Sequence, residues 1–258
     1  LDLLDQYDFR EIGLPLVEPT SLFIDSVGSF TDIVEKEMYS WKDSLNNDQL
    51  TLRPEGTAGC VRAVIQNNVT YNGSAKLFYR GAMFRHENVQ KGRQRQFHQL
   101  GVETFGVSAA AADAEQIIFL DRLWKKLKLK NVSLIINSIG DAADREIYRS
   151  RLIEYFEKNI NTLDDDAKRR YKSNPMRVLD SKNKDMQEML NNAPKLSEYL
   201  SSEAREHFNE LQELLRKNNI NFEVNNRLVR GLDYYNRTVF EWITNELGSQ
   251  GTIAGGGR

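Results

Sequence analysis

The chain has 258 residues, of which 40% are hydrophobic and 28% charged, and its formal net charge is −2. These values are typical of a globular protein with a sizeable core, built as one large domain or as one domain with an insertion. They exclude a globally basic chain, so a nucleic-acid partner would have to bind a local patch of positive charge. The single cysteine, Cys60, excludes an internal disulfide, and one cysteine with three histidines does not fit a thiolate-rich zinc site.

No run of about 18 apolar residues occurs, so we expect no membrane-spanning helix and no membrane partner. No signal peptide is visible, and we expect a cytoplasmic protein. The chain begins at Leu1 instead of a methionine and stops at Arg258, directly after three glycines. We therefore interpret the sequence as a fragment of a longer protein.

The N-terminal part predicts the end of a helix and then a short strand over Glu11–Val17. Pro15 cannot donate a ladder hydrogen bond, which restricts this strand to an edge, a bulge or an interface. Leu50–Leu52 predicts a second strand, and the chain then turns into a helix that ends near Gln66. Thr57 is the candidate N-cap of this helix.

Two longer strands are predicted next, over Lys76–Arg85 and Arg95–Phe105, with a polar and basic segment between them. This pattern favours an antiparallel hairpin with a long mobile loop. A helix with one apolar face is predicted over Ala109–Lys128, because its large apolar residues recur at helical spacing. Val132–Asn137 predicts another strand.

From Ile139 to Asn221 the sequence becomes charged and helical, with no strand-like alternation. We interpret it as a helical insertion between strands of the main sheet. The predicted helices are Asp144–Asn159, Asp164–Tyr171, Asp185–Asn191 and Ser202–Asn218, and the strands that follow are Phe222–Val224, Arg227–Val229, Thr238–Ile243 and Thr252–Ala254. Because strands and helices do not alternate strictly, the fold class is α+β with a mainly antiparallel sheet.

The second strand of the hairpin presents a polar face. Alternate side chains of a strand share a face, so Gln99 and Glu103 lie on the same side as Gly101, while His98, Leu100 and Val102 are expected to pack inward. Phe97 and Phe105 share the polar face. A ligand with a cationic group and ring nitrogens could lie over Gly101. The alternative, a solvated outer face of an edge strand, is about equally compatible with this segment alone.

Arginines mark the other candidate segments. Arg85 and Arg93 flank the hairpin loop and could bind phosphate through their guanidinium groups, although a charged surface loop is the simpler alternative. Glu55 lies at a strand-to-helix turn, where it could receive an ammonium group or only face the helix dipole. Arg230 precedes paired tyrosines, which a tight turn would also explain, and Arg258 follows a glycine run. No Walker phosphate loop and no Rossmann glycine fingerprint occurs, so arginines and a sheet would have to hold any nucleotide.

Together these segments resemble the class II aminoacyl-tRNA synthetases, and within that class the histidyl-tRNA synthetases. Thr51–Cys60 is similar to the histidine loop of the family, Met83–Gly101 to the second class motif, and Leu228–Glu241 to the histidyl signature. Ala254–Arg258 is similar to the start of the third motif, and Pro15 stands where the first motif has its proline. The resemblance covers nearly the whole chain, including the insertion.

The resemblance implies a role for each candidate residue. Histidine would be held by Glu55, Thr57, Gln99, Glu103, Tyr234 and Tyr235, with Glu55 and Gln99 near its ammonium group and Glu103 and Tyr235 at the imidazole nitrogens. Arg85 would bind the α-phosphate of ATP, Phe97 would stack on adenine, and Arg93 and Arg258 would neutralise the β- and γ-phosphates. Arg230 would reach the α-phosphate from the histidine side, where related enzymes use a metal ion. Arg85 and Arg230 would thus be the catalytic pair; no metal ligand is expected in the protein, and Mg²⁺ would accompany the pyrophosphate.

The resemblance also implies partners and a domain plan. The chain would activate L-histidine with ATP and transfer it to the 3′ end of histidine tRNA, most naturally as a homodimer. Residues 1–138 and 222–258 would form the catalytic domain, and residues 139–221 the insertion. A basic cluster of the insertion could contact the RNA acceptor stem or merely form a solvated face; its members are Lys168, Arg169, Arg170, Lys172, Arg177 and Lys182. The anticodon-binding domain of the family is absent. The competing hypotheses are a regulatory paralogue that binds histidine without aminoacylation and a module that only binds or dimerises.

Overall fold

The computed structural model describes residues 1–28, 31–90, 92–246 and 251–258. Its strands are β1 (Arg10–Glu11), β2 (Val17–Pro19), β3 (Tyr39–Lys42), β4 (Gln49–Leu52), β5 (Ala75–Phe84), β6 (Gln96–Phe105), β7 (Val132–Ser138), β8 (Glu223–Val224), β9 (Thr238–Thr244) and β10 (Thr252–Gly257). Its α-helices are α1 (Asp2–Gln6), α2 (Thr20–Val27), α3 (Thr57–Gln66), α4 (Ala110–Lys126), α5 (Ala142–Lys158), α6 (Asp165–Arg170), α7 (Pro175–Val178), α8 (Gln187–Asn191) and α9 (Ser202–Lys217), with a π-helical turn η1 at Ile33–Glu37 and the 3₁₀ turns η2 (Ile160–Thr162), η3 (Lys184–Met186) and η4 (Leu196–Glu198). In the described part of the chain, no helix combines the length and apolarity that crossing a membrane requires.

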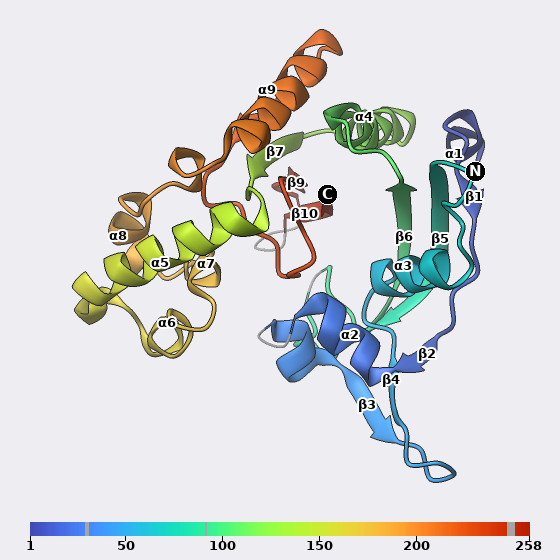
Figure 1. Ribbon diagram of the computed structural model, residues 1–258, viewed down its shortest axis with the longest axis horizontal. Coiled ribbons are helices and arrows are strands. Elements are labelled where there is room, and N and C mark those ends of the chain that lie inside the picture. The colour runs from blue at the N-terminus through green and yellow to red at the C-terminus, as the bar shows by residue number, and fades with distance from the viewer. Residues whose placement is uncertain (29–30, 91, 247–250) are drawn as a thin grey trace.

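The described strands form three small sheets, with orders β1-β5-β6, β10-β9-β7-β8 and β2-β4-β3. Among these strands, five of the seven pairs are antiparallel, and only β1 with β5 and β7 with β8 run parallel. The α+β class and its mainly antiparallel pairing are therefore confirmed. Figure 1 shows the β5–β6 hairpin and the β7–β9–β10 sheet on opposite sides of the centre of the molecule.

Helix α4 joins these two sheets because it is apolar on more than one side. Ile117 packs with β7 and β9 in one buried cluster, which also receives Leu211 and Leu215 of α9. Phe119 packs instead against Phe9 and Phe78, next to α1 and β5. The helix therefore fixes the position of the hairpin relative to the second sheet (Figure 1).

The segment predicted as an insertion has a core of its own, built around Tyr148, Leu152 and Phe156 of α5 and the short helices that follow. Tyr235 and Val239 belong to the same cluster, so the insertion packs directly on the histidyl-like signature segment. Helix α9 lies differently, since it packs on α4 and the second sheet.

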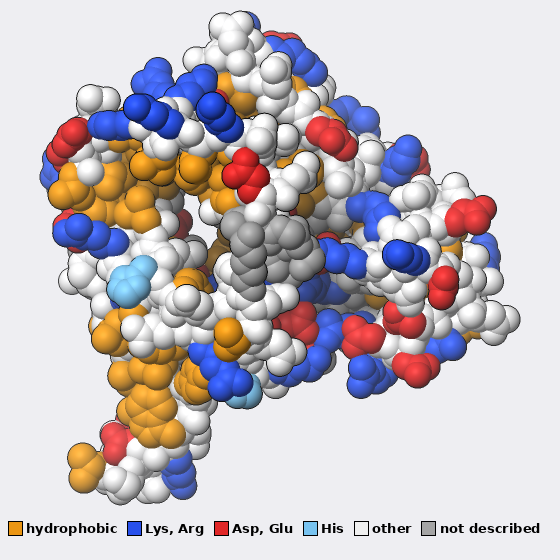
Figure 2. Space-filling model, turned by 180° about the vertical axis from the view of Figure 1, so that it is seen from behind, with side chains coloured by type: hydrophobic (Ala, Val, Ile, Leu, Met, Phe, Trp, Pro, Cys, Tyr) orange, Lys and Arg blue, Asp and Glu red, His pale blue; other side chains and the backbone are white. Residues whose placement is uncertain are grey.

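An arm formed by β2, β3 and β4 extends from the body of the molecule (Figure 1). Four of its large apolar side chains are exposed, namely Leu16, Val17, Trp41 and Leu45, with Leu45 at 92%. Figure 2 shows hydrophobic side chains gathered along this arm. An exposed apolar surface of this extent is typical of a protein–protein interface.

The predicted strand over Glu11–Val17 is wrong. The chain pairs with β5 only at Arg10 and Glu11, and pairs with β4 only from Val17 onward. Between these strands the carbonyl oxygens of Leu14 and Pro15 accept hydrogen bonds from the Arg53 side chain, at 2.8 and 3.3 Å. A guanidinium group thus satisfies the backbone where a neighbouring strand was expected.

The predicted strand over Arg227–Val229 is also wrong. Asn225 starts a turn there: its carbonyl oxygen accepts from the Leu228 amide at 2.9 Å, and its side-chain oxygen accepts from the Arg227 amide at 2.9 Å. This is the local backbone mimicry for which asparagine is known in turns. Helices α2 and α7 and strands β2 and β3 were not predicted, while the other predicted helices and strands exist with boundaries shifted by a few residues.

Candidate active site

The antiparallel register of β5 and β6 determines which polar side chains meet. Tyr79 pairs with Gly101, and Leu77 pairs with Glu103, so Tyr79 and Glu103 are diagonal neighbours on one face. Gly101 was predicted to leave room for a ligand, but the aromatic ring of Tyr79 occupies that space and a Cβ at position 101 would overlap it. The polar face is also a packing face, because Cys60 and Val64 of α3 cover it beside Phe97.

The opposite face of β6 differs from the prediction as well. Val102 packs with Phe78 and Phe119, as expected for an inward-facing residue. His98 and Leu100 are exposed, Leu100 at 46%. The core on that side ends before the strand does, so only part of the face is covered.

Glu55 caps helix α3 and was correctly placed at the start of this helix. Its two carboxylate oxygens accept hydrogen bonds from the amides of Thr57 and Ala58, at 2.7 and 2.9 Å. Thr57 is therefore not the N-cap, contrary to prediction, because it is already the first helical residue and Gly56 precedes it in the capping position. The Thr57 hydroxyl instead donates to Glu103 at 2.7 Å, which joins the helix to the hairpin.

Glu103 has a strongly perturbed pKa. Burial raises the pKa of Glu103 to about 7, the hydrogen bond from Thr57 opposes that rise, and the nearby charge of Glu55 adds to it. Burial raises the pKa of Glu55 too, although backbone amides partly offset the effect. Two acidic groups with raised pKa values in one polar site are typical of a functional site.

Tyr234 and Tyr235 close the cluster from the signature segment. Their ring centroids are 4.7 Å apart. The Tyr234 hydroxyl points to Glu55, with 3.4 Å between the oxygens. Burial is the main cause that raises the pKa of both tyrosines, so both stay neutral hydrogen-bonding groups at neutral pH.

Gln99 shares the polar face of β6 with Glu103. Its side-chain oxygen is buried and has no hydrogen-bond partner among the described residues. A buried acceptor without a donor is destabilising unless a ligand or water satisfies it. Gln99 is therefore available to accept a hydrogen bond from a ligand.

The nucleotide-side residues lie next to this cluster. The Arg85 guanidinium lies over the Phe97 ring, 5.2 Å from its centroid, and its Nε donates to the carbonyl oxygen of Pro54 at 2.8 Å. Arg93 pairs with Glu87 at 2.9 Å, and Arg85 is 3.8 Å from the same carboxylate. The basic loop is thus partly neutralised by its own glutamate; Lys91 of this loop lies outside the described residues.

Arg230 lies beside the tyrosines, with its guanidinium 5.8 Å from the centre of the Tyr235 ring. It forms an ion pair with Glu241, whose second oxygen accepts from Thr252 at 2.9 Å. The Nε of Arg230 is buried and has no hydrogen-bond partner within the described part of the chain. Gly255 lets the arginine pack this closely, because a Cβ there would meet Nη1 at 2.6 Å.

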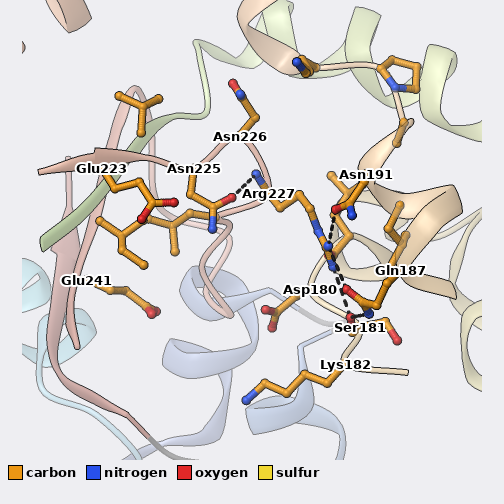
Figure 3. A pocket seen from close by; sticks show the side chains of 18 of the residues that line it. Asp180, Ser181, Lys182, Gln187, Asn191, Glu223, Asn225, Asn226, Arg227 and Glu241 are labelled. Carbon is orange, nitrogen blue, oxygen red and sulfur yellow. Dashed lines mark hydrogen bonds between the residues drawn. The ribbon is translucent and has the colours of Figure 1, made fainter. Parts of the chain in front are cut away.

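A cavity of about 640 Å³ lies between the insertion and the second sheet, with Glu241 in its lining. Figure 3 shows that Glu241, Glu223 and Asp180 point into it. Arg227 crosses its edge and holds the insertion through Gln187 and through carbonyl oxygens near α7. No residue of the cluster around Glu103 lines this cavity, so the cluster and the cavity are separate features.

Arg258 is not brought into the cluster. Its guanidinium pairs with Asp113 at 2.7 Å and donates to the carbonyl oxygens of Val107 and Ala109 at the start of α4. His207 of α9 binds the other oxygen of Asp113 at 2.8 Å. In this arrangement Arg258 ties the last strand to two helices.

Sequence reasoning missed Tyr79 and Glu241 as members of the site. Tyr79 lies in a strand whose odd positions are otherwise apolar, so its hydroxyl became relevant only through the register with β6. Glu241 was included in the signature run but had no role, although its position in β9 on the same run as Arg230 was the available signal.

The chain belongs to the histidyl-tRNA synthetase family, because the sequence profile described as histidyl-tRNA synthetase matches residues 1–258. Among curated proteins, a histidine–tRNA ligase of Methylobacillus flagellatus is 63% identical over 257 residues, and one of Nitrosomonas europaea is 56% identical over 255 residues. Each alignment covers 99% of this chain and 61% of the relative. The chain therefore spans about three fifths of the length of these relatives.

Solved structures agree with the family. The apo histidyl-tRNA synthetase of S. aureus superposes with a TM-score of 0.74 at 33% identity, over 99% of this chain and 59% of that one. A structure from Bacillus halodurans, described as an ATP phosphoribosyltransferase regulatory subunit/histidyl-tRNA synthetase, has a TM-score of 0.65 at 24% identity and supports the fold alone. It covers 99% of this chain and 69% of that one.

Proposed function

We propose that this chain is the catalytic core of a histidine–tRNA ligase. It activates L-histidine with ATP, releases pyrophosphate and transfers histidine to the 3′ end of its tRNA, in the cytoplasm where tRNA is charged. The observation that carries the proposal is a hydrogen-bonded cluster of four residues, Glu55, Thr57, Glu103 and Tyr234. These residues come from three separate chain segments that meet at one polar site.

In this proposal the cluster is the histidine site. Glu103 and Tyr235 bind the imidazole nitrogens, Glu55 and Gln99 bind the ammonium group, and Tyr234 lines the pocket. The unsatisfied oxygen of Gln99 supports its part, because an ammonium group supplies the missing donor. A buried polar site of this kind rejects amino acids without ring nitrogens, since its own groups would be left unpaired.

The arginines bind ATP. Arg85 and Arg230 contact the α-phosphate, Phe97 stacks on adenine, and Arg93 and Arg258 contact the outer phosphates. All four of these arginines are paired with carboxylates, Arg85 and Arg93 with Glu87, Arg230 with Glu241 and Arg258 with Asp113. We infer that the nucleotide competes with these carboxylates for the guanidinium groups, and that Arg258 has the largest rearrangement to make.

Magnesium enters with the nucleotide as part of the substrate. No group of three or more metal-binding side chains is found among the described residues. A Mg²⁺ ion that is held mainly through substrate phosphates and water needs no such protein cage.

The chemistry follows from positioning and charge. The histidine carboxylate attacks the α-phosphorus in line, and negative charge builds on the non-bridging oxygens. Two guanidinium groups directed at those oxygens lower the barrier without a protein nucleophile. None of the side chains in the cluster is assigned as general base for the transfer to tRNA.

The insertion, residues 139–221, is proposed to contact the acceptor stem, and the rest of the chain forms the catalytic domain. Arg145 and Arg149 support this contact, because they line a cavity of about 300 Å³ together with Arg177 and Arg230. Both donate to backbone carbonyl oxygens, at 2.9 Å each, and neither forms an ion pair with the described carboxylates. Glu146 and Asp233 line the same cavity, but neither forms an ion pair with these two arginines, whose positive charge therefore suits an RNA phosphate.

Two arginines of the expected basic cluster have another role. Asp32 accepts from Arg170 at 2.9 Å and from Arg177 at 2.7 Å, which joins the insertion to the segment before η1. Burial alone would raise the pKa of Asp32, but the two guanidinium groups outweigh it and lower the pKa to about 2. These arginines therefore hold the insertion in place more directly than they present charge to RNA.

A homodimer is proposed through the arm formed by β2, β3 and β4. Its exposed residues Leu16, Val17, Trp41 and Leu45 offer the apolar surface that a second copy of the chain would bury. Sedimentation of the complete polypeptide as a monomer at micromolar concentration would remove this part of the proposal.

Histidine-dependent exchange of labelled pyrophosphate into ATP tests the proposed activity. A regulatory paralogue or a simple binding module would bind histidine and show no exchange, whereas a ligase exchanges without tRNA. Absence of exchange by the complete polypeptide, with histidine binding intact, would contradict the proposal that the protein is an enzyme.

A further inference from the structure

We propose that Tyr79 is a positioning residue for histidine recognition, which fixes one oxygen of the Glu103 carboxylate so that the other oxygen receives the imidazole N–H. The inference rests on the proposed function and adds a residue to it. Tyr79 does not contact the reacting atoms in this account and acts through Glu103.

The hydrogen bonds divide the Glu103 carboxylate into two halves. Its Oε1 accepts from the Thr57 hydroxyl at 2.7 Å and from the Tyr79 hydroxyl at 3.2 Å. The two hydroxyl oxygens are themselves 3.2 Å apart. No described residue donates to Oε2, which leaves that oxygen for the substrate.

The ring of Tyr79 is held in place from two sides. A Cβ at Gly56 or at Gly101 would overlap the ring, so these glycines, one before α3 and one in β6, form a slot that only the absence of side chains opens. Tyr79 is 3% exposed and packs against Cys60 and Met83. Its hydroxyl therefore has one accessible position, next to Glu103.

The charged and titratable groups around Glu103 determine how much its charge depends on the hydrogen bond from Tyr79. Glu55 faces it from the start of α3, Cys60 lies behind it, and Tyr234 and Tyr235 face it from the signature segment. None of these is a cation. The anionic form of Glu103 thus depends on hydroxyl donors, and Tyr79 is one of the two that reach it.

The chemical consequence concerns protonation. Burial raises the pKa of Glu103 to about 7, while the hydrogen bonds from Thr57 and Tyr79 lower it. Without the Tyr79 hydroxyl the pKa of Glu103 rises further, and at neutral pH more of the protein carries a protonated acid. A protonated Glu103 has lost the negative charge that attracts an imidazole N–H.

The test is Tyr79→Phe in the complete polypeptide, measured by histidine-dependent pyrophosphate exchange between about pH 5.5 and 9, a range that brackets the raised pKa of Glu103. Phenylalanine keeps the ring in its slot and removes only the hydroxyl. We expect kcat/KM for histidine to fall about tenfold at pH 7, as for the loss of one hydrogen bond to a charged group. The acidic limb of the pH profile of kcat/KM for histidine should shift to higher pH by about half to one unit. The acidic limb of the profile of kcat/KM for ATP, measured at saturating histidine, should stay where it is in the parent.

Tyr148→Phe is the matched control. Tyr148 is 1% exposed and its hydroxyl donates to the carbonyl oxygen of Pro194 at 2.8 Å, within the insertion core. The Tyr148→Phe variant loses a buried tyrosine hydrogen bond within the insertion core and should leave the acidic limb of the pH profile for histidine in place. A Tyr79→Phe profile that matches the Tyr148→Phe profile would show a purely structural role and overturn the proposal.

A double-mutant cycle with Glu103→Gln adds an independent readout. Glutamine cannot be charged, so removal of the Tyr79 hydroxyl should shift no acidic limb in that background and should cost less than in the parent. Equal losses in both backgrounds would contradict the proposal. If the parent protein shows no exchange at all, the proposed function is wrong. That outcome differs from a failure of the Tyr79 proposal, in which the parent is active and the two profiles match.

Discussion

Glu103 is stabilised as an anion by two hydroxyl groups and no cation, and this has a cost for the folded protein. A carboxyl group whose pKa is raised from its ordinary 4.5 to about 7 binds a proton in the folded state that the unfolded chain has already released. Between these two pH values the free energy of unfolding falls as the pH rises, and above about 7 the loss is complete. Under the proposed function, the side chain is retained for histidine binding at the expense of stability.

Glu103→Gln removes the titration and keeps the hydrogen-bond acceptor. Compared with the parent, this variant should gain thermal stability at pH 8 and gain much less at pH 5, while histidine binding is weakened but still measurable. Thermal unfolding at both pH values checks the sign. A variant that is stabilised equally at pH 5 and pH 8, or destabilised at pH 8, would contradict the raised pKa.

Arg230 presents the opposite case, a charge that the fold already neutralises. Its ion pair with Glu241 and its position over the Tyr235 ring hold the guanidinium near the proposed histidine site. Arg230→Ala should reduce the rate of adenylate formation by a factor of roughly 10²–10³ and leave histidine affinity mostly unchanged. Single-turnover adenylation and equilibrium histidine binding measure the two effects, and near-normal turnover would refute this role.

At the scale of elements, helix α5 offers a direct comparison between a cavity-lining and an outward-facing arginine. Arg149 lines the cavity shared with Arg230, whereas Arg151 is 55% exposed and pairs with Glu154 of the same helix. Arg149→Ala should raise KM for tRNA about tenfold and leave pyrophosphate exchange unchanged, because an RNA phosphate loses its partner. Arg151→Ala should change neither, and a rise in KM for ATP in Arg149→Ala would show that the cavity serves the nucleotide.

Elements with their own sequence signal were predictable. Helices α4 and α9 follow from apolar periodicity, the hairpin of β5 and β6 from two strand-like runs with a polar loop between them, and the polar residues of β6 from strand alternation. The strand expected at Glu11–Val17 failed because Arg53, distant in sequence, supplies the hydrogen bonds that a strand partner would have made. Such long-range side-chain contacts leave no local pattern.

The same limit applies to the site. Glu55, Thr57, Glu103 and Tyr234 were named from motifs, and the structure places them within hydrogen-bonding reach of one another. The slot that holds Tyr79 could not be predicted, because it requires the register of two strands and the position of Gly56 at once. The prediction that Gly101 leaves room for a ligand is wrong, because the Tyr79 ring fills that space.

At the scale of the whole molecule, the site depends on contacts between parts that are far apart in the chain. Asp32 joins the N-terminal part to the insertion, Arg227 joins the insertion to the signature segment, and Tyr234 joins that segment to Glu55. A further contact, the ion pair of Arg237 with Asp141, joins the signature segment to the start of the insertion. The cluster around Glu103 therefore lies where several distant parts of the chain are joined.

The central claim is that this cluster binds histidine, and a crystal structure of the complete polypeptide with L-histidine and a non-hydrolysable ATP analogue tests it most directly. The account predicts imidazole nitrogens at hydrogen-bonding distance, about 2.7–3.2 Å, from Glu103 and Tyr235, with the ammonium group at Glu55 and Gln99. Histidine bound elsewhere, for example in the cavity lined by Glu223 and Asp180, with the Glu103 cluster unchanged, would contradict it.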